Sequence, residues 1–300
     1  MKHFFLITID TEGDNLWGVK DIRAKIATEN ARYLPRFQEL CEKYGFVVTY
    51  LTNYEMALDP FFLDFASDGI KRGTIEIGAH EHSWNQPPYF PLFKSPSYRG
   101  KPYLSEYPSI IIREKLKRLT ALLEDSFGCG ITSHRGGRWC MDGRIAKTLL
   151  ELGYIVDCTC TPWISRTGQP GWTIGSKGTD WSQWTNEVKV LSEGRNGKKL
   201  IEVPATVINR KNGITPVWFR PNGHNLDTML GMIDYINDSG INYIEFMIHS
   251  SELMPGGNPT FKRNGQIEKL YDDMNAVFSK LRKIGYVGAG LSNYAKTIEI

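Results

Sequence analysis

The chain has 300 residues, of which 41% are hydrophobic, and its 36 lysines and arginines against 33 aspartates and glutamates leave a formal net charge of +3. Charge this small and this evenly spread argues against a nucleic-acid backbone or an anionic membrane surface as the partner. The sequence offers neither a signal-peptide core nor the roughly 18 apolar residues in succession that a membrane span requires. We therefore expect a cytoplasmic protein without a membrane span.

The five cysteines are odd in number and scattered along the chain, which predicts reduced thiols rather than a disulfide framework. Cys158 and Cys160 form a lone CxC pair within the strand-like segment YIVDCTC. Because residues two apart in a strand share one face, we interpret this pair as strand residues rather than as metal ligands.

Short apolar runs alternate with longer segments of helical periodicity along the whole chain. The expected strands are 3–9, 46–52, 74–79, 154–159, 200–206, 243–248 and 286–291. The expected helices are 29–43, 59–71, 109–127, 142–152, 225–239 and 265–284. Strand followed by helix, repeated, requires a parallel sheet with crossover helices. With no glycine-rich dinucleotide loop, the pattern favours an α/β fold of the distorted, TIM-like (β/α) barrel type with about seven strands, formed as a single domain over 1–300.

Two long segments interrupt this alternation, at 84–108 and 163–198, and both are expected to be loops. Loops of this length in a compact domain usually cover or line a site, and their aromatic residues are suited to stacking on sugar rings. The alternative, that these aromatic residues pack against the body of the protein, remains open.

Polar side chains gather where the expected strands end. In a barrel of this kind the carboxyl ends of the strands converge on one mouth, so residues at those positions are candidates for a site. Four of the six histidines fall there, each beside a charged residue. The residues at these ends are Asp10, Glu12, His80, Glu81, His82, His134, Arg135, Asp157 and His249. His3 and His224 lack such neighbours, and we interpret them as structural or surface residues.

Asp10 and Glu12 stand two residues apart at the end of the first strand, where both side chains point to the mouth and repel each other. A divalent cation would relieve that repulsion. One carboxylate and two imidazoles with a fourth position open is the recurring catalytic zinc pattern, and Glu12, His80 and His82 can supply it. Asp10 would then hold or deprotonate the activated water. The alternative is that Asp10 ends the strand in a turn and accepts backbone hydrogen bonds.

Arg135 and His249 complete this arrangement. Arg135 carries a planar cation suited to gripping a carboxylate, and Asp10 is its expected partner. The unperturbed pKa of histidine lies near neutrality, so His249 could be the general acid that protonates a leaving group. The alternative is that His249 is a hydrogen-bonded residue that closes the barrel. Asp157 and Glu202 are both possible acids to support His249.

Taken together, five segments resemble the NodB-homology polysaccharide deacetylases, carbohydrate esterase family four. The segments are ITIDTEGD at 7–14, EIGAHEHSWNQPP at 76–88, SHRGGRW at 133–139, VDCTCTPW at 156–163 and MIHSSELMPGG at 247–257. They occur in the expected order over roughly residues 5–295 and are most similar to the WalW-type branch, which is found with surface-polysaccharide genes. The resemblance implies a distorted (β/α) barrel and a divalent metal, usually zinc.

The resemblance also implies roles for individual residues. Asp10 takes the position of the base, Arg135 that of the residue orienting it, His249 that of the acid, and Asp157 that of the fourth-motif aspartate. Glu12 and His80 take ligand positions. The family's second histidine ligand normally stands four residues after the first, where this chain has Trp84, so His82 would have to replace it. Substrate binding falls to Trp84, Arg138, Trp139 and Trp163.

The resulting hypothesis is a metal-dependent hydrolase, with Zn²⁺ as the expected metal, that removes an N-acetyl group from an amino sugar of a surface polysaccharide or its precursor. Two alternatives remain open. One is a metal-dependent hydrolase of the C–N bond in a cyclic imide or another N-acyl compound. The other is a non-catalytic carbohydrate-binding protein on the same barrel.

Overall fold

The computed structural model describes residues 2–14, 16, 26–90, 100–195, 197–209 and 216–299. One sheet runs in the order β10-β1-β2-β3-β4-β5-β7-β6, and β11 lies beside the start of β1. Its strands are β1 (Phe4–Thr11), β2 (Val48–Thr52), β3 (Ile75–Glu81), β4 (Ser133–Gly136), β5 (Val156–Asp157), β6 (Lys189–Glu193), β7 (Lys199–Glu202), β10 (Tyr243–His249) and β11 (Val287–Gly288). A separate hairpin pairs β8 (Val207–Ile208) with β9 (Val217–Trp218).

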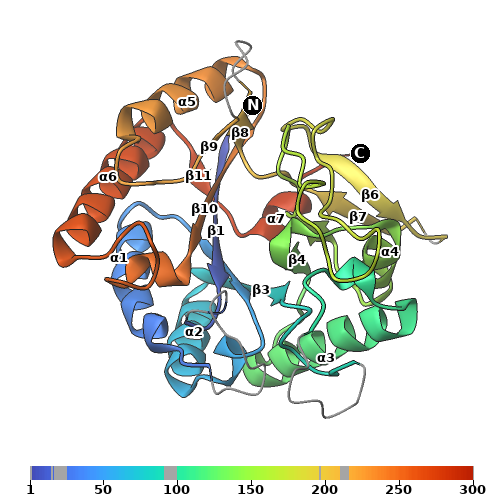
Figure 1. Cartoon of the computed structure of the whole chain (residues 1–300). Coiled ribbons are helices and arrows are strands. Elements are labelled where there is room, and N and C mark those ends of the chain that lie inside the picture. The colour runs from blue at the N-terminus through green and yellow to red at the C-terminus, as the bar shows by residue number, and fades with distance from the viewer. Residues whose placement is uncertain are drawn as a thin grey trace.

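Helices surround this sheet, as Figure 1 shows. They are α1 (Leu34–Lys43), α2 (Pro60–Arg72), α3 (Ser109–Phe127), α4 (Gly143–Glu151), α5 (Leu226–Asp238), α6 (Asn264–Lys283) and the short α7 (Leu291–Ala295). The expected α/β fold of the (β/α) barrel type is confirmed in the form of a curled half-barrel. No pairing joins β10 to β6 among the described residues, so the sheet does not close there.

The structure differs from the sequence prediction at one edge of the sheet. The segment 163–198 is not loop throughout, because β6 lies inside it and pairs antiparallel with β7. Each residue of β6 is either partly buried or exposed, so this strand has no buried apolar face. An exposed edge strand of this kind gives too weak a hydrophobic pattern to detect from sequence. In the other expected loop, residues 91–99 lie outside the part of the chain that the structure describes.

Alternation along β1 separates two environments. Phe5, Ile7 and Ile9 belong to the large apolar cluster, whereas Thr8 and Asp10 face the interior of the half-barrel. The two sets lie on opposite sides because successive side chains in a strand point to opposite faces. The polar interior of the half-barrel is therefore backed by an apolar core.

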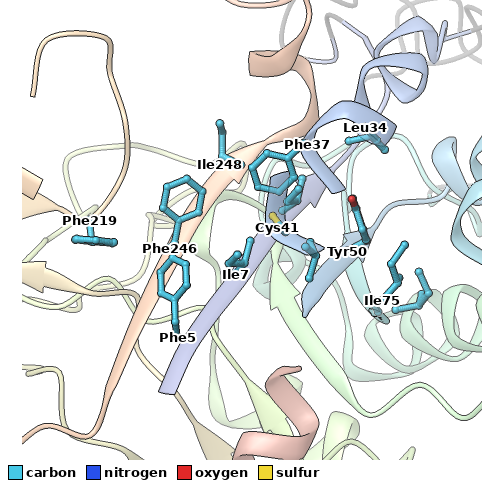
Figure 2. Packing of buried hydrophobic residues seen from close by; sticks show 14 of the residues in the cluster. Phe5, Ile7, Leu34, Phe37, Cys41, Tyr50, Ile75, Phe219, Phe246 and Ile248 are labelled. Carbon is cyan, nitrogen blue, oxygen red and sulfur yellow. The ribbon is translucent and has the colours of Figure 1, made fainter. Parts of the chain in front are cut away.

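Phe246 on β10 is a central residue of that core (Figure 2). Its ring centroid lies 6.1 Å from that of Phe5, 6.5 Å from Phe37, 6.4 Å from Phe219 and 5.5 Å from Phe278. Aromatic packing of this kind joins β1 and β10 to α1 and α6. This packing therefore holds in place β1 and β10, which carry Asp10 and His249.

The five cysteines form no disulfide bond, as expected. Among the described residues, no helix has both the length and the apolar composition needed to span a membrane. Location in the cytoplasm and a single domain over 1–300 stay predictions.

We expect the substitution Phe246→Ala to lower the free energy of unfolding by about 3–5 kcal/mol, because it leaves a cavity among four rings. Urea unfolding followed by circular dichroism measures this change. Ile110→Ala is the control, since Ile110 is 68% exposed on α3 and should change stability by less than about 0.5 kcal/mol. If the two substitutions lower the free energy of unfolding equally, the aromatic cluster does not stabilise the packing of β1 and β10.

Candidate active site

Glu12, His80 and His82 bring three possible metal ligands together at the mouth of the half-barrel. Their ligand atoms all lie within 4.8 Å of one another, and all three residues are buried. Glu12 Oε2 lies 3.0 Å from His82 Nε2 and 3.7 Å from His80 Nε2. The two histidine Nε2 atoms are 3.0 Å apart. The structure thus assembles the donor group that the sequence predicted.

Strand geometry accounts for this assembly. His80 and His82 are two residues apart at the end of β3, so both point to the same side of the sheet. Glu12 follows β1, and its backbone is held on both sides. Its carbonyl accepts a hydrogen bond from Asn30 Nδ2 at 2.9 Å, and its N–H donates to Ser250 Oγ at 3.1 Å.

A backbone carbonyl orients the first histidine. His80 Nδ1–H donates to the carbonyl oxygen of Arg135 at 2.9 Å, which leaves the Nε2 lone pair directed at Glu12. Metal-binding histidines usually have such a partner for the other ring nitrogen, because it selects the tautomer and sets the ring orientation.

Trp84 supports the ring of His82. The indole of Trp84 stacks on the His82 ring with centroids 4.3 Å apart and an interplanar angle of 18°. The residue that stands where the resemblance would place a second histidine ligand thus packs against the candidate ligand His82. A substrate-binding role for Trp84 stays a prediction.

The group fits a divalent cation by its donors and its electrostatics. Glu12 Oε2 is buried and accepts no well-aligned hydrogen bond from the residues that the structure describes. Burial raises the pKa of Glu12, but the His82 and His80 rings more than offset this, so the carboxyl is held ionised. One carboxylate and two imidazoles leave a coordination position open for water or substrate, as in catalytic zinc sites.

Arg135 holds Asp10 beside this group, as predicted. Arg135 is completely buried, and its Nη1 donates to Asp10 Oδ1 at 2.7 Å. Burial raises the pKa of Asp10, but the Arg135 guanidinium, helped by His80 and His249, lowers it below its usual value. Asp10 is therefore a carboxylate at neutral pH, ready to accept a proton.

Sequence reasoning missed Glu245, which completes the environment of Arg135. Glu245 accepts hydrogen bonds from Arg135 Nη2 and from Thr8 Oγ1 in the half-barrel interior. Arg135 Nη2 also donates to Thr8 Oγ1 at 2.9 Å, and Nε donates to the carbonyl of Cys158 at 3.1 Å. A single acid within the apolar run YIEFMI was the available signal for this residue.

His249 lies on the other side of Asp10. Its Nε2 is 3.6 Å from Asp10 Oδ2, while its Nδ1 faces Glu252 Oε2 at 3.3 Å and Arg220 Nη2 at 3.1 Å. Glu252 Oε2 also accepts the His249 backbone N–H at 2.9 Å and an Arg220 hydrogen bond at 2.5 Å. Burial lowers the pKa of His249, but the hydrogen bond to Glu252 raises it above its usual value.

The expectation that Asp157 or Glu202 supports His249 is wrong, because Glu252 does so. Asp157 instead contacts His134, with Asp157 Oδ1 2.6 Å from His134 Nδ1, and His134 Nε2 lies 2.9 Å from Glu81 Oε2. These residues alternate with Arg135 and His80 along the strands and therefore point to the opposite face of the sheet.

This second cluster is a buried ionic network rather than part of the acid–base pair. Burial lowers the pKa of His134, but its hydrogen bonds to Asp157 and Glu81 raise it to about 9. Glu202 accepts a hydrogen bond from the Cys160 N–H at 2.7 Å. Among the described residues, no hydrogen bond joins Asp157 to Asp10 or His249, so the placement does not support the predicted catalytic role of Asp157.

The three other predicted substrate-binding residues share an unusual backbone conformation. Arg138, Trp139 and Trp163 have φ angles of 56°, 59° and 60°. Left-handed conformations cost non-glycine residues on the order of 1–3 kcal/mol and tend to occur at functional sites. All three residues are partly exposed. Their role in binding stays a prediction.

A cavity of about 680 Å³ adjoins the site. Its walls include Glu12, Arg220, His249 and Glu252, together with the loop around Gly256–Lys262. Because both a ligand of the candidate metal group and the candidate acid line it, this cavity offers room for a substrate next to the reacting groups.

No family model matches the chain, and no curated protein matches it. Solved structures do match. A proposed polysaccharide deacetylase from Mycobacterium smegmatis is 15% identical, with 99% of this chain and 91% of that chain covered and a TM-score of 0.62. The 4-alpha-glucanotransferase of Thermococcus litoralis is 12% identical over 99% of this chain and 41% of that chain, with a TM-score of 0.56. Puue allantoinase is 10% identical over 98% and 88%, with a TM-score of 0.54.

The chain therefore has the fold of the polysaccharide deacetylases, and the predicted resemblance is confirmed at the level of the fold. Its similarity to the WalW-type branch stays a prediction. Because the three matched structures carry different enzyme names, the fold does not select the reaction, which has to be argued from the site.

We expect Trp84→Ala to weaken zinc binding about 10-fold, because His82 loses the ring that fixes its orientation. Trp84→Phe retains a flat ring and should bind zinc nearly as well as the parent chain. Competition with a chromophoric chelator measures the affinity of each purified variant. Unchanged affinity in Trp84→Ala would mean that the stacked indole does not position this ligand.

Proposed function

We propose that this protein is a metal-dependent hydrolase that removes an N-acetyl group from an amino sugar of a surface polysaccharide or its precursor. The observation that carries the proposal is the buried group of Glu12, His80 and His82 next to the Asp10–Arg135 pair, with His249 on the other side of Asp10. A ligand group, a carboxylate base and an imidazole acid are the parts that amide hydrolysis requires.

Glu12, His80 and His82 would hold the metal ion, and zinc suits this donor set. Such an ion supplies Lewis acidity, which polarises an amide carbonyl and makes water acidic enough to attack near neutral pH. Asp10 accepts the proton of the attacking water. Arg135 keeps Asp10 ionised and turns one of its oxygens, Oδ2, toward the reacting groups.

His249 donates a proton to the nitrogen that leaves. Its Nε2 faces Asp10 at 3.6 Å and its partly exposed ring lines the cavity, so the same imidazole is within reach of a bound substrate. Glu252 stabilises the imidazolium form, which is the form that can donate. The products are acetate and a free amino sugar.

The site bears on both alternatives. A non-catalytic binding protein has no need of a buried ligand group, a base and an acid in one place, so their presence favours an enzyme. A hydrolase of a cyclic imide or another N-acyl compound could use the same residues. The sugar substrate is favoured by the motif resemblance and by the aromatic residue Trp139, whose ring lies 5.2 Å from the Arg135 guanidinium carbon.

We expect Asp10→Asn to reduce acetate release from N-acetylated oligosaccharides by about 10²–10⁴-fold, because an amide cannot accept the proton of water. This variant should still bind zinc. His82→Ala should lose both zinc and activity, because it removes a ligand. Elemental analysis of the purified protein and an enzymatic acetate assay measure the two properties.

His224→Ala is the matched control, since His224 lies on the surface and should retain both the metal and the rate. Full metal content and full activity in His82→Ala would refute the ligand assignment. Hydrolysis of cyclic imides without any release of acetate from sugars would favour the C–N hydrolase alternative.

A second prediction concerns the acid. Glu252 raises the pKa of His249, so Glu252→Gln should lower it, and the remaining charge of Arg220 should lower it further. Because the imidazolium form is the active one, kcat/KM should begin to fall at a lower pH in this variant. The pH profile of kcat/KM measures the shift, with the distant substitution Glu268→Gln as control. If the alkaline limb of the kcat/KM profile is unchanged in Glu252→Gln, His249 is not the acid.

A further inference from the structure

Arg166 stands in an unusual environment beside the site. Its guanidinium carbon lies 5.4 Å from the ring centroid of Trp139 and 5.8 Å from that of Trp218. The residue is partly exposed, but its Nε is buried and has no hydrogen-bond partner among the residues that the structure describes. The guanidinium is thus held between two aromatic faces with donor capacity left unused.

No acid compensates this charge within the part of the chain that the structure describes. No carboxylate there lies within 4.0 Å of the Arg166 guanidinium. The Arg138 guanidinium, which lies 5.1 Å from the ring centroid of Tyr103, is close enough to lower the pKa of Arg166 by charge repulsion. Burial, with the charge of Arg138, lowers the pKa of Arg166 to about 10. A bound anion would offset both the desolvation cost of the Arg166 charge and its repulsion by Arg138.

The aromatic residues connect these cations to the reacting groups. Trp139 contacts both Arg166 and Arg135. The guanidinium carbon of Arg135, which holds Asp10, lies 5.2 Å from the Trp139 ring centroid. A methyl group built on Gly137 would come within 3.0 Å of His82 Cδ2, so the turn that carries Arg138 lies against the candidate metal group. Trp139 and Trp218 meet edge to face with centroids 5.1 Å apart.

We propose that Arg166 and Arg138, on the platform of Trp139 and Trp218, bind an anionic group of the substrate. The substrate would be an acidic N-acetylated polysaccharide, in which a sugar next to the acetylated one carries a carboxylate or a sulfate. This inference rests on the proposed function and narrows its substrate class. A planar guanidinium pairs with carboxylate or sulfate through two parallel hydrogen bonds, while the indole rings contact the apolar faces of the sugars.

Calorimetric titration with two oligosaccharides of equal length tests this. A hyaluronan hexasaccharide carries carboxylates between its N-acetylated sugars, whereas chitohexaose is N-acetylated and neutral. Binding is measured on the full chain with the Asp10→Asn substitution, which slows hydrolysis. Hyaluronan should bind at least about 10-fold more tightly, and this preference should weaken with added salt.

Arg166→Met in that background retains the length and the apolar stem of the side chain. It should weaken hyaluronan binding about 10-fold or more while changing chitohexaose binding less than about 3-fold. Arg166→Lys should keep part of the preference, because it retains the charge but not the paired donors. Arg72→Met, an exposed residue paired with Glu42, is the control and should change neither ligand.

Equal binding of the acidic and neutral hexasaccharides, or an equal loss of both in Arg166→Met, would overturn the anionic subsite. The acetate assay on the parent chain keeps this result separate from the proposed function. Deacetylation of chitohexaose without preference would refute the subsite alone. Preference for acidic ligands without any acetate release would support the subsite and refute the deacetylase.

Discussion

The buried guanidinium of Arg135 is the interaction on which the site depends. It reaches across the inside of the half-barrel from β4 and hydrogen-bonds Asp10 on β1, Glu245 on β10 and the carbonyl of Cys158 after β5. Without it, the buried carboxylates of Asp10 and Glu245 would lose the cation that both contact, which is strongly unfavourable. The same side chain therefore ties strands together and keeps Asp10 ionised.

Strand alternation divides the charged residues into two groups with different roles. Inside the half-barrel lie the candidate ligands, the base and Arg135, whereas His134 with its two carboxylates lies on the other face. Parallel strands place both groups at the same height in the sheet, so only the face distinguishes them.

Short segments that follow the strands supply contact partners for the candidate site residues. Glu252 comes only three residues after His249, within a short 3₁₀ turn, so the acid and its support move as one unit. Trp84 follows His82 at a similar distance and stacks on it. The candidate ligand His82 is therefore supported within its own loop. The left-handed residues Arg138 and Trp139 follow in the turn after β4, where the Trp139 ring contacts the guanidinium groups of both Arg135 and Arg166.

The sequence alone determined the alternation of the main strands and helices, the fold class and the gathering of Asp10, Glu12, His80, His82, Arg135 and His249, because hydrophobic periodicity and strand-end position are local properties. The hairpin of β8 and β9 and the short helix α7 were not predicted. The edge strand β6 escaped prediction, because its pairing with β7 supplies what its composition lacks. The partner of His249 and the environment of Arg166 were decided only by the tertiary structure. Which of several acids meets a given histidine depends on the face it occupies and on how the loops fold back, and sequence spacing does not encode those distances.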